Sequence, residues 1–226
     1  MLFRSQLLLD PYNNWYPDLE DMRRKIVSHP EISGILVVNP DNPTGMVYPE
    51  EVIREVVAIA EEFDLFMVSD EIYSNLFYGG TEHKKLASVI GKVPGMAMRG
   101  ISKEFPWPGS RCGWVEFYNT DKDENFARYA KSVNDAKMMQ VCATTLPQKA
   151  LPVIMSDPRY YPYLGERCAR YWEKSCYAYD VFSKLPQAHL NRTNGAFYLT
   201  VVFRDGVLKE GQRLTPMNDR AAELIA

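Results

Sequence analysis

Gly34-Ile35-Leu36-Val37-Val38 runs directly into Asn39-Pro40-Asp41-Asn42-Pro43-Thr44-Gly45, and this stretch decides the fold. The first half is a short apolar run rich in β-branched residues, which is typical of a strand buried on both faces in a parallel sheet. The second half consists almost entirely of turn-forming residues, so the strand is expected to end there and a loop to begin.

A helix and a second strand are predicted immediately downstream. Pro49 is expected to open the helix, and the next strand is Leu65-Phe66-Met67-Val68, which ends at Ser69-Asp70-Glu71-Ile72-Tyr73. The helix is predicted from apolar residues at helical spacing, namely Val52, Ile53, Val56, Val57, Ala60 and Phe63. Strand, helix and strand at this spacing form a βαβ unit, in which the two strands are parallel and the crossover is right-handed.

A third strand leads into a loop that carries a lysine and an arginine. Residues 96–101 are the predicted strand, and the loop after it holds Ser102-Lys103 and Gly109-Ser110-Arg111-Cys112-Gly113 before Trp114-Val115-Glu116-Phe117 turns back beside the strand. Ligands bind at the carboxyl ends of the strands in open α/β sheets. If the strands are parallel, one edge of the sheet gathers five candidate residues: Asn42, Asp70, Tyr73, Lys103 and Arg111.

The rest of the chain is predicted to be mainly helical, with a final hairpin. Asp18 is expected to cap a first helix, residues 121–140 and 145–156 to form two more, and a long amphipathic helix to end near Lys184. Residues 189–193 and 196–203 are predicted strands around the hairpin-turn dipeptide Asn194-Gly195, and the last twenty-odd residues are expected to be polar and then helical. The fold class is α/β, and its character changes after about residue 160.

Composition excludes several classes of protein. The chain has 226 residues and a net charge of −3, and no segment is strongly basic, so nucleic acid is not an expected partner. No apolar run approaches the roughly 20 residues of a membrane span, and the first residues lack the core of a signal peptide. Four cysteines and three histidines show no metal-binding spacing, so we expect free thiols, no metal site and a cytoplasmic protein.

Three motifs in register resemble one known family. The loop 39–45 is similar to an N-P-x-N-P-T-G motif, Asp70-Glu71-Ile72-Tyr73 to D-E-x-Y, and the lysine loop to S-K followed by G-x-R-x-G. All three, in this order, resemble the class I/II aminotransferases, which are pyridoxal-phosphate enzymes of fold type I. The resemblance implies a mainly parallel sheet with helices on both faces. It also implies a partial cofactor-binding large domain at 1–160, and a connecting helix with the start of a small domain at 161–226.

The resemblance also implies a role for each candidate. Lys103 would form a Schiff base with the cofactor's aldehyde and then move the substrate proton. Asp70 would keep the pyridine nitrogen protonated, Asn42 and Tyr73 would bind the ring hydroxylate, and Ser102 with Arg111 would hold the phosphate. The implied substrates are an amino acid and a 2-oxo acid, and the implied parent is a homodimer. Each residue also has a purely structural explanation as a turn, cap, core or surface residue, but all of them falling in family order favours the enzyme.

The match has two departures. The family often has a serine or threonine three residues before the lysine, where this chain has Gly100. The family's N-terminal phosphate-binding helix start and its C-terminal arginine for the α-carboxylate have no counterpart here. We therefore expect the chain to be the central part of a longer aminotransferase, with little activity on its own.

Other functions stay open on the sequence alone. The same loops would suit another fold-type-I pyridoxal-phosphate enzyme, such as a β-lyase, a decarboxylase or a cyclopropane-carboxylate synthase. The chain would also suit an inert α/β module that binds partners through its aromatic-rich segment 158–172. A nucleotide-dependent dehydrogenase ranks far lower, because no G-x-G-x-x-G follows a strand.

Overall fold

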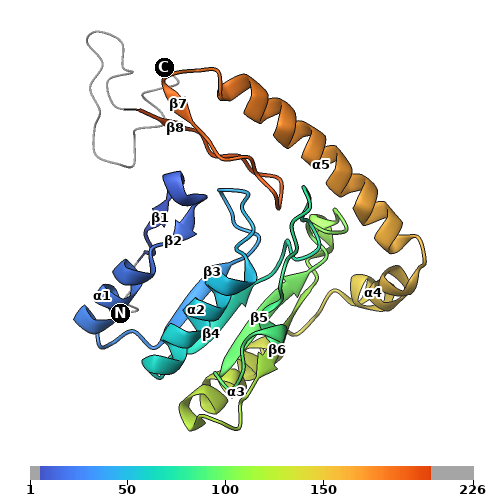
Figure 1. Cartoon of the computed structure of the whole chain (residues 1–226). Coiled ribbons are helices and arrows are strands. Elements are labelled where there is room, and N and C mark those ends of the chain that lie inside the picture. Colours follow the sequence, from blue (N-terminus) through green and yellow to red (C-terminus); the bar gives the residue numbers. More distant parts are fainter. Residues whose placement is uncertain (1–5, 205–226) are drawn as a thin grey trace, which may run out of the picture.

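The computed structural model describes residues 6–204, and a four-stranded sheet lies at its centre (Figure 1). In spatial order the strands are β3 (Gly34–Val38), β4 (Phe66–Asp70), β5 (Gly95–Gly100) and β6 (Gly113–Tyr118). β3, β4 and β5 are parallel, and β6 runs antiparallel to β5. The predicted βαβ unit and the strand that turns back after the lysine loop are therefore confirmed.

The three parallel strands end at the same edge of the sheet. Val38 is paired with Asp70, and Asp70 with Met98, so their carboxyl ends are in register. The ladder continues one step further, because the backbone N–H of Asn39 donates to the Asp70 carbonyl at 3.1 Å and that of Glu71 to the Met98 carbonyl at 2.9 Å. This register places the three predicted functional loops side by side.

Two helices cover one face of the sheet. They are α1 (Leu19–Ser28) and α2 (Glu50–Glu62), and their buried side chains form one core with the strand residues Ile35, Val37 and Met67. Asp18 caps α1 as predicted, since its carboxylate accepts from the Asp21 N–H at 2.9 Å. Pro49 is the residue just before the first turn of α2 rather than its first helical residue.

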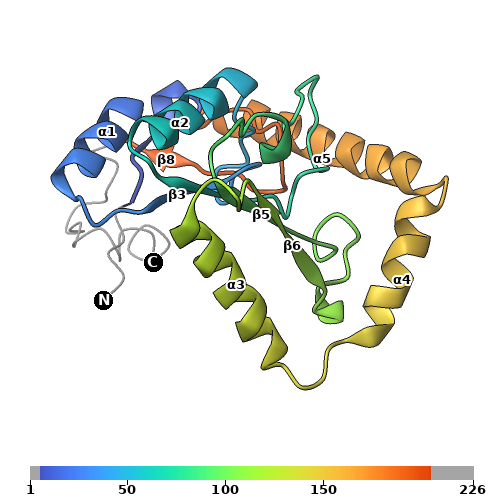
Figure 2. The same cartoon turned by 90° about the horizontal axis from the view of Figure 1, so that it is seen from below.

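The opposite face is covered only in part. Helix α3 (Glu124–Met138) lies there, and its Phe126 packs against Val68 and Met96 (Figure 2). Leu36 on the edge strand β3 is 54% exposed, so the prediction that this strand is buried on both faces is wrong for one face. The physical reason is the position of α3, whose buried side chains meet β4 and β5 and leave the edge strand uncovered.

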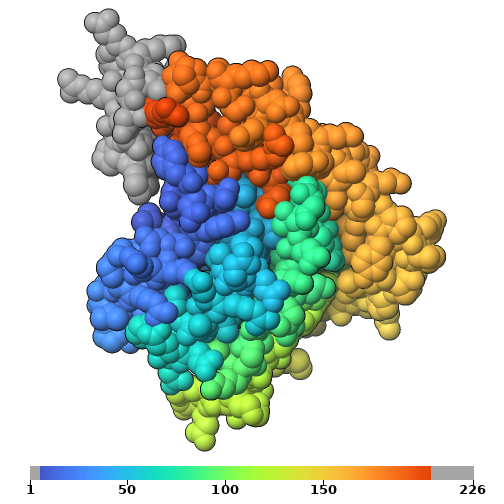
Figure 3. Space-filling view, in the orientation of Figure 1, coloured from blue at the N-terminus to red at the C-terminus, as the bar shows by residue number. Residues whose placement is uncertain are grey.

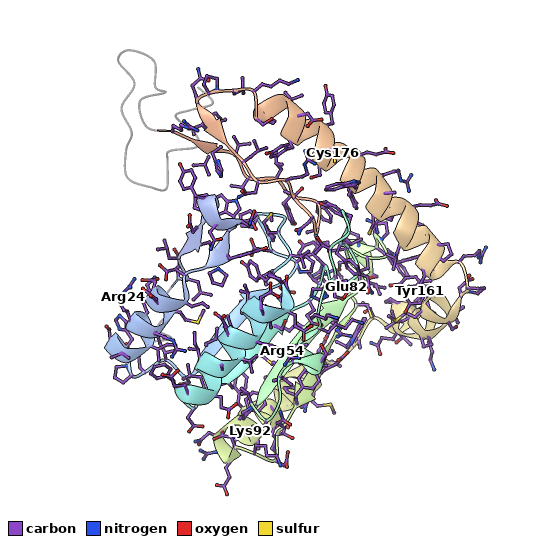
Figure 4. All side chains as sticks on the ribbon, viewed as in Figure 1. Arg24, Arg54, Glu82, Lys92, Tyr161 and Cys176 are labelled. Carbon is purple, nitrogen blue, oxygen red and sulfur yellow. The ribbon has the colours of Figure 1, made fainter. Side chains whose placement is uncertain are left out.

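Helices α4 (Thr145–Ser156) and α5 (Tyr160–Phe182) follow α3 in the chain. Figure 2 shows α4 joining α3 to α5, and α5 passes diagonally above the ends of the strands in Figure 1. Figure 4 marks Tyr161 in the first turn of α5 and Cys176 further along the same helix. The predicted helices are thus all present: the one at 145–156 has the predicted bounds, the one at 121–140 is shorter at both ends, and the long helix ends at Phe182, two residues before Lys184.

The predicted hairpin around Asn194-Gly195 is wrong in its details. Strand pairing is present only at the open end of the hairpin, where β7 (Ala188–His189) pairs with β8 (Val202–Phe203). The N–H groups of Asn194 and Gly195 both donate to the Gly45 carbonyl, at 3.1 and 2.9 Å, and the Asn194 side chain accepts from the Val47 N–H at 2.8 Å. These partners lie in the loop after β3, so tertiary contacts replace the expected two-residue turn.

The remaining described elements are small. β1 (Leu9–Asp10) pairs with β2 (Tyr16–Pro17), and short 3₁₀ turns lie at Pro11–Asn13, Leu86–Ser88 and Pro108–Ser110. Within residues 6–204, none of the helices combines the length and the apolar character needed to cross a bilayer. The polar and helical segment predicted for the last twenty-odd residues lies outside the described residues. The division into domains at residues 160 and 161 remains a prediction, and α5 begins at that point.

Candidate active site

The loop after β3 is built so that Asn42 stands at its exposed tip. Asp41 is buried, and its carboxylate accepts hydrogen bonds from both the N–H and the hydroxyl of Thr44, while burial raises the pKa of Asp41. The loop is also tied to the segment that leads into α2, because Asn39 Oδ1 accepts from the Tyr48 N–H at 2.9 Å. Asn39, Asp41 and Thr44 therefore have structural roles, and Asn42 is left to contact other groups.

Asp70 and Tyr73 lie together after β4. Asp70 ends the strand, and its Oδ1 accepts from the Ile72 N–H at 3.1 Å, which turns the chain and directs Tyr73 inward. Burial is the main cause that raises the pKa of Tyr73, followed by its bond to Tyr198 and the negative charge of Asp70, and a hydrogen bond with Asn42 opposes them. Tyr73 thus interacts with two other predicted residues, Asn42 from the loop after β3 and Asp70 from the end of β4.

Glu104 fixes the lysine loop to the segment after β4. It is 6% exposed, and its carboxylate accepts from the Ser74 hydroxyl at 2.8 Å, from the Asn75 N–H at 3.0 Å and from the Asn75 side chain at 2.9 Å. The Tyr160 hydroxyl adds a fourth bond at 3.2 Å. A carboxylate held this firmly stabilises the chain directly beside Lys103.

The Lys103 amine opens into a cavity of about 670 Å³ between the lysine loop, α5 and the segment 193–199. Its Nζ lies 5.7 Å from the centre of the Phe197 ring, and the same ring meets Tyr73 edge-on at 5.5 Å between centroids. Ser102 also lines the cavity. One aromatic ring therefore links the lysine to the cluster of Tyr73, Asp70 and Asn42.

The charge of this cavity is one-sided. Its lining includes the three cations Lys103, Arg167 and Lys174, and no carboxylate is among the described residues that line it. Hydroxyl groups are frequent, from Tyr78, Ser102, Tyr171, Ser175, Thr193 and Tyr198. Such a lining favours an anionic ligand that accepts several hydrogen bonds.

Arg111 does not share this environment. It is exposed, it follows the 3₁₀ turn Pro108–Ser110 with a φ of 51°, and its Nη1 donates to the Pro108 carbonyl at 3.3 Å. Arg111 is not among the residues that line the cavity, and neither are Asn42, Asp70 and Tyr73. The structure therefore brings together Asn42, Asp70 and Tyr73, places Ser102 and Lys103 in the cavity beside them, and leaves Arg111 on the surface nearby.

The glycine three residues before the lysine has a packing reason. Gly100 ends β5 opposite Gly113, and a Cβ added at Gly100 would lie 2.9 Å from the Cys112 carbonyl oxygen and 3.1 Å from Ile72 Cδ1. Backbone atoms cannot move aside as a flexible side chain does. The close approach of β5 and β6 therefore favours glycine at position 100, where the family that the chain resembles often has a serine or threonine.

Several lining residues were missed from the sequence. Tyr198 bonds to Tyr73, Phe197 faces Lys103, and Arg167, Tyr171 and Lys174 come from α5. A signal for the α5 residues existed, because Leu164, Arg167, Tyr171 and Ser175 recur at helical spacing along one stripe. An arginine within such a stripe is unusual, since buried guanidinium groups require partners.

The chain is similar to known proteins over most of its length. Residues 4–217 match the family model "Aminotransferase class I and II". The chain is 49% identical over 217 residues to an uncharacterized aminotransferase of Methanocaldococcus jannaschii, covering 96% of this chain and 50% of that protein. It is 29% identical to the glutamate-pyruvate aminotransferase of Escherichia coli, covering 85% of this chain and 46% of that protein.

A solved structure shows the same arrangement of elements. The alanine aminotransferase from Pyrococcus furiosus aligns with a TM-score of 0.83 and 28% sequence identity, over 92% of this chain and 51% of that one. The chain thus spans about half the length of the relatives that it matches.

Proposed function

The chain belongs to the class I and II aminotransferases, and from that premise we propose that the protein as a whole transfers an amino group from an amino acid to a 2-oxo acid with pyridoxal 5′-phosphate. The observation that supports the proposal is that Lys103 lines a cationic cavity and follows β5, whose end is in register with the ends of β3 and β4. A primary amine is the group that an aldehyde cofactor requires.

The residues present fit this cofactor. Pyridoxal phosphate carries a phosphate and a ring hydroxylate, and the cavity offers three cations and several hydroxyl groups, with no carboxylate among its described lining residues. Asp70 and Tyr73 interact beside it, which supplies one acid and one phenol at the same edge of the sheet. The cavity volume of about 670 Å³ lies within the range of small-molecule sites.

Each residue has a distinct task in the proposed site. Asp70 stabilises a positive charge on the pyridine nitrogen, and Asn42 and Tyr73 bind the ring hydroxylate. Ser102 is proposed to donate to the phosphate, and Arg111 to reach it from the surface of the same loop. When bound, the cofactor would supply an electron sink, and the Lys103 Nζ would accept the proton from the substrate's Cα and deliver it to the cofactor's C4′.

The names of the relatives support a small substrate. The Escherichia coli protein is called a glutamate-pyruvate aminotransferase, and that of Mycobacterium tuberculosis, 27% identical, an alanine aminotransferase. We propose alanine or glutamate as the first donors to assay. We also propose a cytoplasmic homodimer: four free cysteines suit a reducing compartment, and exposed apolar residues on α3 and α4, such as Met138 and Leu146, suit a subunit contact.

The test is a spectroscopic titration of the chain with pyridoxal phosphate. We expect a saturable change in cofactor absorbance that is lost in Lys103→Ala and kept in Lys149→Ala, because Lys149 is an exposed lysine on α4. Pyridoxal without the phosphate should bind more weakly than the phosphorylated form. An equal response of the Lys103→Ala variant, or no saturable response of the unaltered chain, would contradict the proposal.

A further inference from the structure

We propose that Arg167 is a positioning residue that holds the backbone of Lys103 from helix α5. Arg167 is 8% exposed, and its Nη1 donates to the Lys103 carbonyl at 2.9 Å and also to the Glu104 carbonyl. Its Nη2 donates to the Tyr171 hydroxyl at 3.0 Å. One side chain, 64 residues away in the sequence, thus contacts the peptide groups on which the lysine is mounted.

Two of the backbone hydrogen bonds that flank Lys103 are long, from the Ile101 N–H to the Cys112 carbonyl at 3.4 Å and from the Trp107 N–H to the Ile101 carbonyl at 3.5 Å. The Trp107 N–H also donates to the Phe105 carbonyl, but none of these bonds involves the N–H or the carbonyl of Lys103. Side chains supply the rest, because the Glu104 carboxylate anchors one side of the peptide and Arg167 the other. Loss of Arg167 would leave the Lys103 and Glu104 carbonyls without this partner.

The cost of burying this charge indicates that its position matters. The rings of Tyr163 and Tyr171 pack against the Arg167 guanidinium, and each ring centre lies 5.6 Å from the guanidinium carbon. Within the described part of the chain, no carboxylate forms an ion pair with Arg167. A buried cation without a carboxylate is expensive to desolvate, so its acceptors and the faces of the two rings must offset that cost. Here the acceptors are the carbonyls of the lysine loop.

This role rests on the proposed function only where the cofactor is concerned. A lysine side chain has a flexible stem of four carbons, so the position of the amine is well defined only if the Cα is fixed. By holding the carbonyl of Lys103, Arg167 restricts the volume that the Lys103 Nζ explores within the cavity. We therefore expect loss of Arg167 to slow covalent attachment at Lys103 without abolishing it.

The first test needs no cofactor. Hydrogen exchange of the chain should be compared among the unaltered protein, Arg167→Ala, Arg167→Lys and Arg170→Ala, where Arg170 is an exposed arginine one turn later on the same helix. Arg167→Ala should raise exchange about tenfold in the peptide covering residues 101–107. Arg167→Lys should show a partial increase, and Arg170→Ala none. Unchanged exchange in the loop, or an equal rise throughout β3, β4 and β5, would overturn the proposal.

The second test measures how fast limiting pyridoxal phosphate is trapped on Lys103 by borohydride. Arg167→Ala should slow trapping about tenfold, with partial recovery in Arg167→Lys and the normal rate in Arg170→Ala. A normal trapping rate in Arg167→Ala would contradict the positioning role. If the unaltered chain is not labelled at Lys103, the proposed function fails, and the exchange experiment still decides the role of Arg167.

Discussion

The phenolic oxygens of Tyr73 and Tyr198 lie 2.6 Å apart, although the two residues are separated by 125 positions in the sequence. Their rings meet edge-on, with centroids 5.6 Å apart. Tyr73 belongs to the turn after β4, and Tyr198 to the segment that returns from α5, so this bond joins the sheet edge to the upper part of the molecule. Figure 3 shows that part, drawn in orange at the top, packed against the blue and green parts of the chain.

The first prediction concerns the acidity of Tyr73. Burial, the hydrogen bond to Tyr198 and the charge of Asp70 all raise its pKa, in that order. Tyr198→Phe should therefore lower the pKa of Tyr73, and Asp70→Asn should lower it less. The measurement is a pH titration of the tyrosine Cζ carbons by NMR, with Tyr73→Phe to assign the signal. A Tyr73 titration that is the same in the unaltered protein and in both variants would show that the bond is absent in solution.

The second prediction concerns Gly45, where a left-handed backbone meets a close neighbour. Its φ is +71°, and an added Cβ would lie 2.3 Å from the Tyr198 carbonyl oxygen. Gly80 has a similar φ of +76° with nothing within 4 Å, so Gly80→Ala isolates the conformational strain, about 1 kcal/mol. Gly45→Ala should cost at least about 2 kcal/mol more in chemical denaturation, because it adds the clash. Equal losses would mean that the 193–198 segment does not dock on this loop.

The third prediction concerns the departure at Gly100. A serine there would restore the hydroxyl that the family often has, but its Cβ would press on the Cys112 carbonyl. We expect Gly100→Ser to destabilise the protein by about 1–3 kcal/mol and to bring no tighter binding of inorganic phosphate. Gly109→Ser is the matched control, because a Cβ at Gly109 meets nothing within 4 Å. Thermal unfolding of both variants, with and without phosphate, gives the answer, and a stabilised Gly100→Ser protein would refute the packing argument.

The fourth prediction concerns pH. Burial, with the charges of Lys85 and Arg99, lowers the pKa of His83 from its ordinary 6.5 to about 4. Between pH 6.5 and about pH 4, His83 is protonated in the unfolded chain and neutral in the folded chain. The free energy of unfolding should therefore fall as the pH decreases through this range. The contribution is on the order of 3 kcal/mol.

The carboxylates also titrate in this range, so the experiment compares two proteins. Denaturation of the unaltered chain and of His83→Gln should be measured from pH 8 to pH 4. The difference in stability between them should shrink or change sign in favour of His83→Gln as the pH falls. Parallel pH profiles would show that His83 does not stay neutral in the fold.

Local signals in the sequence predicted the sheet edge well. Short apolar runs identify β3 and β4, and the turn residues after them identify the loops, because both are properties of neighbouring residues. The helices are found from spacing in the same way. Leu36 was misjudged because its burial depends on which strands α3 covers, and that is decided by packing rather than by the strand itself.

Contacts between residues far apart in the chain could not be predicted from the sequence, for a physical reason. Nothing near Arg167 indicates that its guanidinium reaches the Lys103 carbonyl, and nothing near Tyr198 indicates its bond to Tyr73. Asn194-Gly195 has the composition of a hairpin turn, but bonds to the Gly45 carbonyl and the Val47 N–H override that preference. Parts of a site that come from distant segments therefore require the fold to be known.

The most direct test of the central claim is to identify which lysine carries the cofactor. The chain is incubated with a slight excess of pyridoxal phosphate, treated with borohydride to make the linkage permanent, digested and analysed by mass spectrometry. We predict that the label falls on Lys103, whose amine opens into the cationic cavity, and that it disappears when Lys103 is replaced by alanine. Label spread evenly over the surface lysines, or concentrated on any lysine other than Lys103, would contradict the account.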